Sequence, residues 1–129
     1  MRVAFLGTPR SAVPALQALL AADHRLALVI TQPDRPAGRS SVPRPPEVKR
    51  AALSAGLPVI QPDRVKSVEF LETIAGASPD VLVVVAYGRI LPEPVLSVAP
   101  HGAVNLHFSL LPRWRGAAPV QWALASGDA

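Results

Sequence analysis

The amino-acid sequence predicts an α/β fold in which helices cover both faces of a parallel, Rossmann-like β-sheet. Five short apolar runs alternate with five segments of helical spacing, as in repeated βα units joined by right-handed crossovers. The run Val81–Ala86 contains only Val, Leu and Ala. A central parallel strand needs such a run because helices cover both of its faces.

Each strand is expected at a short apolar run bounded by glycine, proline or polar residues. Between the strands, apolar residues three or four positions apart predict helices. The expected strands are residues 2–7, 26–31, 58–61, 81–86 and 102–108.

The first helix is predicted over residues 12–22, with Ser11 as its N-cap and Pro14 tolerated in its first turn. Residues 31–46 contain five prolines and no regular period, so they are expected to form a loop. The other helices are expected from Pro46 or Glu47 to Ala55, and at 67–76, 92–98 and 116–126.

Length and composition fit one globular domain, since 129 residues, half of them apolar, suffice for a core. The absence of cysteine excludes disulfide bonds and thiolate chemistry. His24, His101 and His107 lack a supporting carboxylate cluster, so no metal site is expected. No apolar run approaches the ~20 residues that cross a bilayer. The first run is too short for a secretory signal, so a cytoplasmic protein without membrane contact is expected.

Positive charge is concentrated in one stretch of the chain. Residues 33–50 contain five basic and two acidic side chains, and therefore hold +3 of the net charge of +4. A basic loop suits a polyanion such as RNA. Most short charge clusters are solvated surface, however, and charge alone leaves both interpretations open.

The turn after the first strand argues against a dinucleotide site. Residues 7–11 lack the Gly-x-Gly-x-x-Gly fingerprint, and Pro9 removes a backbone donor that a pyrophosphate would use.

Asn105 and His107 are the strongest candidates for chemistry. They stand two residues apart on a predicted strand, which places them on one face. Asn can donate to a developing oxyanion, and His can move a proton near neutral pH. Residues 109–112 end in a proline and are expected to end the strand. The pair therefore lies at a strand end, where open α/β sheets bind ligands. The alternative is a strand-end histidine satisfied by a neighbouring carbonyl.

The run after this pair, Ser-Leu-Leu-Pro-Arg-Trp-Arg-Gly-Ala-Ala-Pro at 109–119, resembles the active-site signature of the folate-dependent formyltransferases. Three more blocks match in order: Gly7–Pro9, Thr31–Arg39, and Val84–Gly88 with Ile90–Pro92. The 31–39 block is similar to the substrate loop of the methionyl-tRNA formyltransferases. The resemblance implies a formyltransferase fold that transfers a formyl group from 10-formyltetrahydrofolate to the methionine amine of initiator tRNA, a step of translation initiation.

The resemblance also implies roles for individual residues. Asn105 would donate to the oxyanion and His107 would move the proton. Arg39 would contact the acceptor end of the tRNA. Trp114 and Arg115 would either line the substrate cleft or pack in the interior of the domain. The residues expected to bind the folate, for which core packing is the alternative role, are Ser109, Leu110, Leu111 and Pro112, with Tyr87, Gly88, Ile90 and Leu91 on the pterin side.

The sequence departs from the family pattern at several places. The family's third catalytic residue, an Asp, and its C-terminal tRNA-binding domain are not found within these 129 residues. Residues 40–46 replace a glycine and paired lysines, Arg10 and Ser11 replace an acidic–aromatic pair, and Phe108 replaces a small residue.

We therefore expect residues 1–129 to be an incomplete N-terminal formyltransferase domain. Alone, it is expected to be inactive and prone to self-association, while the full-length protein is expected to be a monomer. The alternatives are a non-catalytic folate- or tRNA-binding remnant and a related formyltransferase that acts on an amino-sugar.

Overall fold

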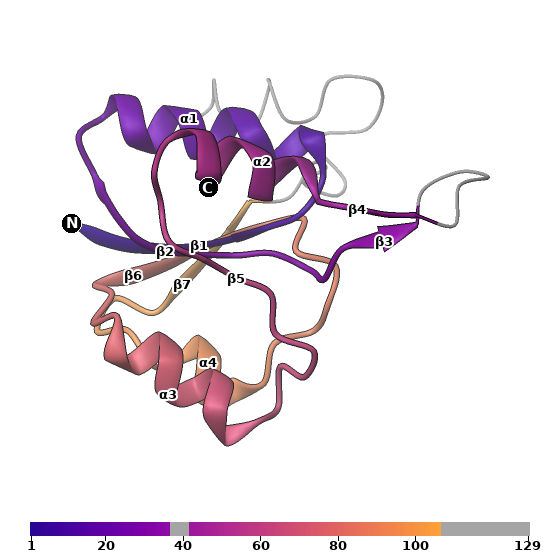
Figure 1. Cartoon of the computed structure of the whole chain (residues 1–129). Helices are drawn as coiled ribbons and strands as arrows, with labels where there is room; N and C mark the ends of the chain where they lie inside the picture. The colour runs from indigo at the N-terminus through magenta and orange to yellow at the C-terminus, as the bar shows by residue number, and fades with distance from the viewer. Residues whose placement is uncertain (37–41, 107–129) are drawn as a thin grey trace, which may run out of the picture.

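The computed structural model describes residues 1–36 and 42–106, so the helix expected over 116–126 lies outside the described residues. Figure 1 shows a sheet with helices on both faces. Within the described residues, the first half contains β1 (Arg2–Gly7), the 3-10 turn η1 (Arg10–Ala12), α1 (Val13–Ala21), β2 (Arg25–Ile30), β3 (Arg35–Pro36), β4 (Pro43–Arg44) and α2 (Glu47–Ser54). The second half contains β5 (Val59–Ile60), α3 (Val68–Gly76), β6 (Val81–Val85), α4 (Glu93–Leu96) and β7 (Ala103–Leu106).

The main sheet has five strands in the order β5-β2-β1-β6-β7, and each neighbouring pair is parallel. The predicted parallel α/β fold is confirmed. β7 pairs with β6 so that Asn105 lies opposite Val84, and Leu106 lies opposite Val85. The last two positions of the expected fifth strand, 107 and 108, lie outside the described residues.

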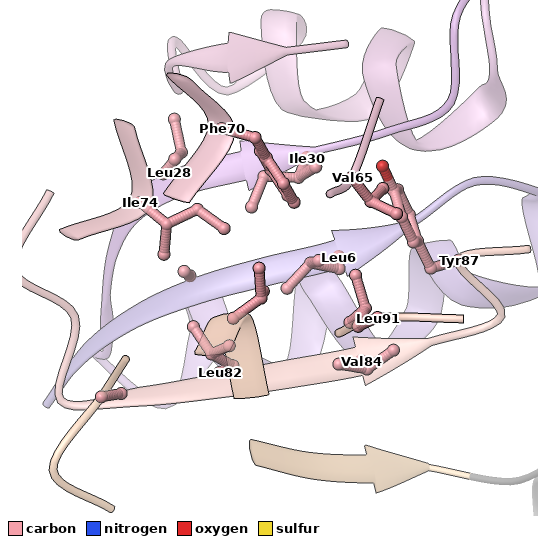
Figure 2. Close-up of a cluster of buried hydrophobic side chains, with 13 residues drawn as sticks. Leu6, Leu28, Ile30, Val65, Phe70, Ile74, Leu82, Val84, Tyr87 and Leu91 are labelled. Carbon is pink, nitrogen blue, oxygen red and sulfur yellow. The ribbon is translucent and has the colours of Figure 1, made fainter. Parts of the chain in front are cut away.

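Alternate side chains of the central strands pack into two separate hydrophobic cores, one on each face of the sheet. In β1, Phe5 packs with side chains of α1 and α2, while Leu6 packs with side chains of α3 and α4. This alternation follows from the two-residue period of a strand. Figure 2 shows the second core, where Leu6 and Leu82 lie near Phe70 and Ile74 of α3. Because helices cover both faces of the sheet, a ligand is expected to bind at the loops that follow the strand ends.

The first helix begins later than expected. Ser11 lies inside η1 and does not cap α1, whose N-cap is Ala12 with no side-chain hydrogen bond. The physical reason is the extended Pro9, whose carbonyl accepts from the Ala12 amide at 3.0 Å and closes a tight turn first. By contrast, Ser67 caps α3 by accepting from the Phe70 amide at 3.1 Å.

The proline-rich stretch is also more ordered than expected, since β3 and β4 pair as an antiparallel hairpin. The hairpin projects away from the main sheet (Figure 1). Its pairing spans only two residues on each side, which is too short to leave a periodic signal in the sequence. Over the described part of the chain, no helix is long and apolar enough to span a membrane.

Candidate functional site

The carboxyl ends of β1, β2, β5 and β6 are joined by a small set of hydrogen bonds. Thr8 Oγ1, just after β1, donates to the Tyr87 carbonyl beyond β6 at 2.8 Å. The backbone N–H of Gln32, beyond β2, donates to Thr8 Oγ1 at 3.4 Å. Gln61 Nε2, beyond β5, donates to the Gln32 carbonyl at 3.0 Å. These bonds fix the relative positions of the loops that form this edge.

Gly88 is placed by the same arrangement. Its φ of +95° lies in a region that side chains rarely adopt, and a Cβ there would collide with Nε2 of Gln32. Glycine at position 88 therefore allows the Gln32 side chain to lie against the loop that follows β6.

Asn105 lies in an open pocket of about 410 Å³ between the ends of β6 and β7. Gly88 and Ile90 line the same pocket, and 92% of the Ile90 side chain is exposed. The pocket therefore combines the Asn105 amide donor and the cationic Arg89 with an apolar wall, which suits a partly apolar ligand that carries a reactive carbonyl. Leu91 lines an adjoining cavity of about 510 Å³ that also contains Asn105.

Tyr87 and Leu91 have mainly a packing role. Both belong to the core between the sheet and α3 and α4, and Tyr87 is only 2% exposed. The left-handed φ of Ala86 (+52°) turns the chain at the end of β6, where the Tyr87 ring enters this core. In Figure 2 its hydroxyl points away from Val84. That hydroxyl has no hydrogen-bond partner within the described part of the chain, and burial raises the pKa of the Tyr87 phenol.

Several predicted site residues cannot be placed against Asn105. The pairing of Asn105 with His107, the folate wall and the tRNA contact therefore stay predictions. The residues concerned, all outside the described ranges, are Arg39, His107, Ser109, Leu110, Leu111 and Pro112.

A second opening at the same edge, which sequence reasoning missed as a site, is a groove of about 870 Å³. We call it the arginine groove. Its charged lining residues are Arg10, Arg35, Arg44, Arg50 and Glu47. The excess of positive charge at residues 33–50 indicated a basic surface in this part of the chain. Arg10 lies outside that window, so the sequence did not indicate that it joins the same surface.

The negative charge of Asp34 is balanced by Lys49, and Gln61 also bonds its carboxylate. Gln61 Nε2 donates to Asp34 Oδ1 at 2.6 Å, and Lys49 Nζ lies 3.1 Å from the same oxygen. The hydrogen bond from Gln61, followed by the contact with Lys49, lowers the pKa of the Asp34 carboxyl. The carboxylate thereby ties the start of the hairpin to α2 and to the end of β5.

Comparison with known proteins shows the family to which this chain belongs. The formyl transferase family model matches residues 1–129. A methionyl-tRNA formyltransferase of Anaeromyxobacter dehalogenans is 56% identical over 128 residues, which is 99% of this chain and 41% of the relative. A methionyl-tRNA formyltransferase of Moorella thermoacetica is also 56% identical, with the same two coverages. The chain thus spans about 41% of the length of these curated relatives.

Solved structures agree on the fold. A phosphoribosylglycinamide formyltransferase of Bacillus halodurans has a TM-score of 0.65 at 23% identity, over 98% of this chain and 66% of that one. A formyltetrahydrofolate deformylase of Pseudomonas syringae has a TM-score of 0.62 at 22% identity, over 98% and 42%. At these identities the likeness supports the sheet and its layers, and no particular substrate.

Proposed function

Since the chain belongs to the formyl transferase family, we propose that it contains the formyl-transfer site of a methionyl-tRNA formyltransferase. The observation that carries the proposal is the position of Asn105, exposed in a pocket at the carboxyl edge of the sheet, where open α/β folds bind ligands. The similarity to methionyl-tRNA formyltransferases over 99% of the chain supports the choice of acceptor.

The proposed donor is 10-formyltetrahydrofolate, and the pocket around Asn105 suits the reacting end of that molecule. Its apolar wall, to which Ile90 contributes, would pack against the flat pterin ring, with Gly88 and Tyr87 also lining the pocket. Leu91 and residues 109–112 would complete the wall. The reaction as proposed needs no metal ion.

Asn105 and His107 would divide the chemistry between them. When the methionine amine adds to the formyl carbon, the formyl oxygen gains negative charge, and the Asn105 amide would donate a hydrogen bond to it. His107 would take the proton from the attacking nitrogen and deliver it to the folate nitrogen as the bond from that nitrogen to carbon breaks. The products are then the formylated amine and tetrahydrofolate, with atoms and charge balanced.

The acceptor would be methionyl initiator tRNA, and Arg39 would contact its acceptor end. Arg suits this task because its planar guanidinium can bind a phosphate with two hydrogen bonds.

The test incubates the protein in its full natural length with methionyl initiator tRNA and 10-formyltetrahydrofolate. Formylmethionine is then measured after deacylation of the tRNA. We expect rapid formylation that depends on both substrates. A parallel incubation with amino-sugars tests the amino-sugar alternative, and formylation of the sugar alone would overturn the tRNA assignment. Folate binding without transfer to any acceptor would identify a non-catalytic remnant.

A further inference from the structure

The β3–β4 hairpin has little of its own to hold it in place. Its paired segments are two residues long, and each contains one proline, Pro36 or Pro43. Proline has no backbone N–H, so among these paired residues only Arg35 and Arg44 can donate across the hairpin. Short two-stranded hairpins are marginally stable by themselves. Because the hairpin projects away from the main sheet (Figure 1), its direction depends on contacts at its base.

An ion pair joins the two ends of the hairpin. Asp34 directly precedes β3, and Lys49 belongs to α2, the helix that follows β4. Lys49 Nζ lies 3.1 Å from Oδ1 and 3.3 Å from Oδ2 of Asp34, so the ammonium group contacts both carboxylate oxygens. Both side chains are partly buried, which leaves the pair less screened by salt than a fully exposed one. The pair thereby closes the base of the hairpin.

Gln61 fastens this base to the main sheet. It directly follows β5, which pairs with β2. Its Nε2 donates to Asp34 Oδ1 at 2.6 Å and to the Gln32 carbonyl at 3.0 Å. One amide group thus uses both of its N–H bonds on the segment that enters the hairpin. We call the side chains of Asp34, Lys49 and Gln61 the hairpin anchor.

The anchor is connected to the pocket that contains Asn105 through Gln32. The Gln32 backbone is held by Gln61, and its side chain lies against Gly88, which lines the pocket. Gln32 Oε1 also accepts from Arg35 Nη2 at 3.2 Å, at the first residue of the hairpin. Loss of the anchor would therefore change the position of the hairpin relative to the pocket.

We propose that Asp34 is a positioning residue, which holds the β3–β4 hairpin in place beside the pocket that contains Asn105. The identity of the acceptor rests on the proposed function, in which Arg39, between β3 and β4 in the sequence, contacts the tRNA. The anchoring itself rests on the contacts of Asp34. When the hairpin is loose, binding of the acceptor also has to order it, which weakens binding without changing the chemical step.

The first measurement is hydrogen exchange, by NMR, at the backbone amides of Arg35 and Arg44. Asp34→Ala removes every contact of the anchor carboxylate and should speed this exchange about tenfold. Exchange at Phe5 in the middle of the sheet should not change, because the cluster is local. Glu72→Ala is the matched control, since it removes an exposed carboxylate from α3 outside the anchor.

The second measurement is steady-state formylation by the full-length protein. Asp34→Ala should raise KM for methionyl initiator tRNA about tenfold and leave kcat and KM for 10-formyltetrahydrofolate unchanged. Asp34→Asn should retain part of the effect of Asp34, because its amide oxygen can still accept from Gln61 Nε2 while the attraction to Lys49 is lost. Glu72→Ala should leave all three constants unchanged.

Several results would overturn the proposal. Unchanged exchange at Arg35 and Arg44 in Asp34→Ala would mean that the anchor does not hold the hairpin. Equally faster exchange at Phe5 would indicate a general loss of stability. A lower kcat at unchanged KM would place Asp34 in the chemical step, and faster exchange at unchanged KM would mean that the acceptor does not need the anchored hairpin.

The two measurements also separate this proposal from the proposed function. If the unmodified full-length protein formylates no acceptor, but Asp34→Ala still speeds exchange at Arg35 and Arg44, the proposed function fails and the anchoring stands. If methionyl-tRNA is formylated and Asp34→Ala changes neither KM nor exchange, the proposed function stands and the positioning role fails.

Discussion

The two openings at the carboxyl edge of the sheet are built in different ways. The pocket around Asn105 forms between β6 and β7, two adjacent strands whose register fixes which residues share it. The arginine groove depends on a short turn and a hairpin outside the main sheet. The first is partly apolar, while the second is strongly basic. The carboxyl edge is thus divided into a pocket with an amide donor and an apolar wall, and a groove with positive charge.

The largest effect that would test this division is expected at Asn105. Replacing Asn105 with Ala removes the oxyanion donor, so the rate of formylation by the full-length protein should fall by about 10²–10³. Asn105 is exposed, so the free energy of unfolding should hardly change. Thr73→Ala, which removes an exposed hydroxyl bonded to the Glu69 carbonyl, is the matched control and should leave the rate unchanged, because Thr73 lines neither cavity that contains Asn105. An unchanged rate in Asn105→Ala would contradict its role as the donor.

The next largest effect is expected at the boundary between the two openings. Gly88→Ala should lower the free energy of unfolding by about 1–2 kcal/mol for the left-handed backbone. The collision with Gln32 Nε2 should add a smaller cost, because this atom is the end of a flexible side chain that can move aside.

Gly56→Ala is the control, since Gly56 has a φ of +72° but no atom of a neighbouring residue within 4 Å of the point where a Cβ would lie. Denaturant unfolding of both variants, and of Gly88→Ala combined with Gln32→Ala, would measure the two contributions separately. Equal losses at Gly88 and Gly56 would show that Gln32 does not constrain the loop.

A smaller effect is expected at Tyr87, which tests whether its role is packing. Tyr87→Phe removes a buried hydroxyl without a partner among the described residues, so the free energy of unfolding should rise by about 1 kcal/mol. Tyr87 is the only tyrosine, so phenolate absorbance reports its ionisation directly. Its pKa is raised above 10.0, and the unfolded chain therefore ionises first. The contribution of Tyr87 to stability should be constant below pH 10.0 and fall above it, and Tyr87→Phe should remove that fall.

The smallest effect is expected at Asp34, a third of whose side chain (33%) is exposed. Its pKa should lie below its ordinary value of 3.8 and rise towards that value both in Gln61→Ala and in Lys49→Met. Because the folded pKa is lowered, this contribution to stability is present above pH 3.8 and is lost as the pH falls through the folded pKa. Carboxyl titration by NMR would measure both variants, and an unchanged pKa in either would show that this partner does not stabilise the carboxylate.

The main sheet and its helices could be predicted from sequence because burial on both faces forces continuous apolar strands. β6 is the clearest case, since each of its residues is Val or Leu. The position of Asn105 at a strand end followed from the same pattern. The 3-10 turn at Arg10 and the hairpin could not be predicted, because two- and three-residue elements impose no period. Tyr87 was expected at the pterin side; it packs in the core and also lines the pocket that contains Asn105, and its contact with a folate stays a prediction.

The place of β1 in the middle of the sheet has a consequence for a chain emerging from the ribosome. Once residue 60 has emerged, β1, β2 and β5 are all available, together with α1 and α2. The other edge of β1 has no partner until β6, which ends at Val85, has emerged as well. During that interval a largely apolar strand has one open edge, and such edges pair readily with other chains. The topology thus leaves this edge of β1 open while residues 61–85 are being synthesised, and a chaperone bound during that interval would protect it.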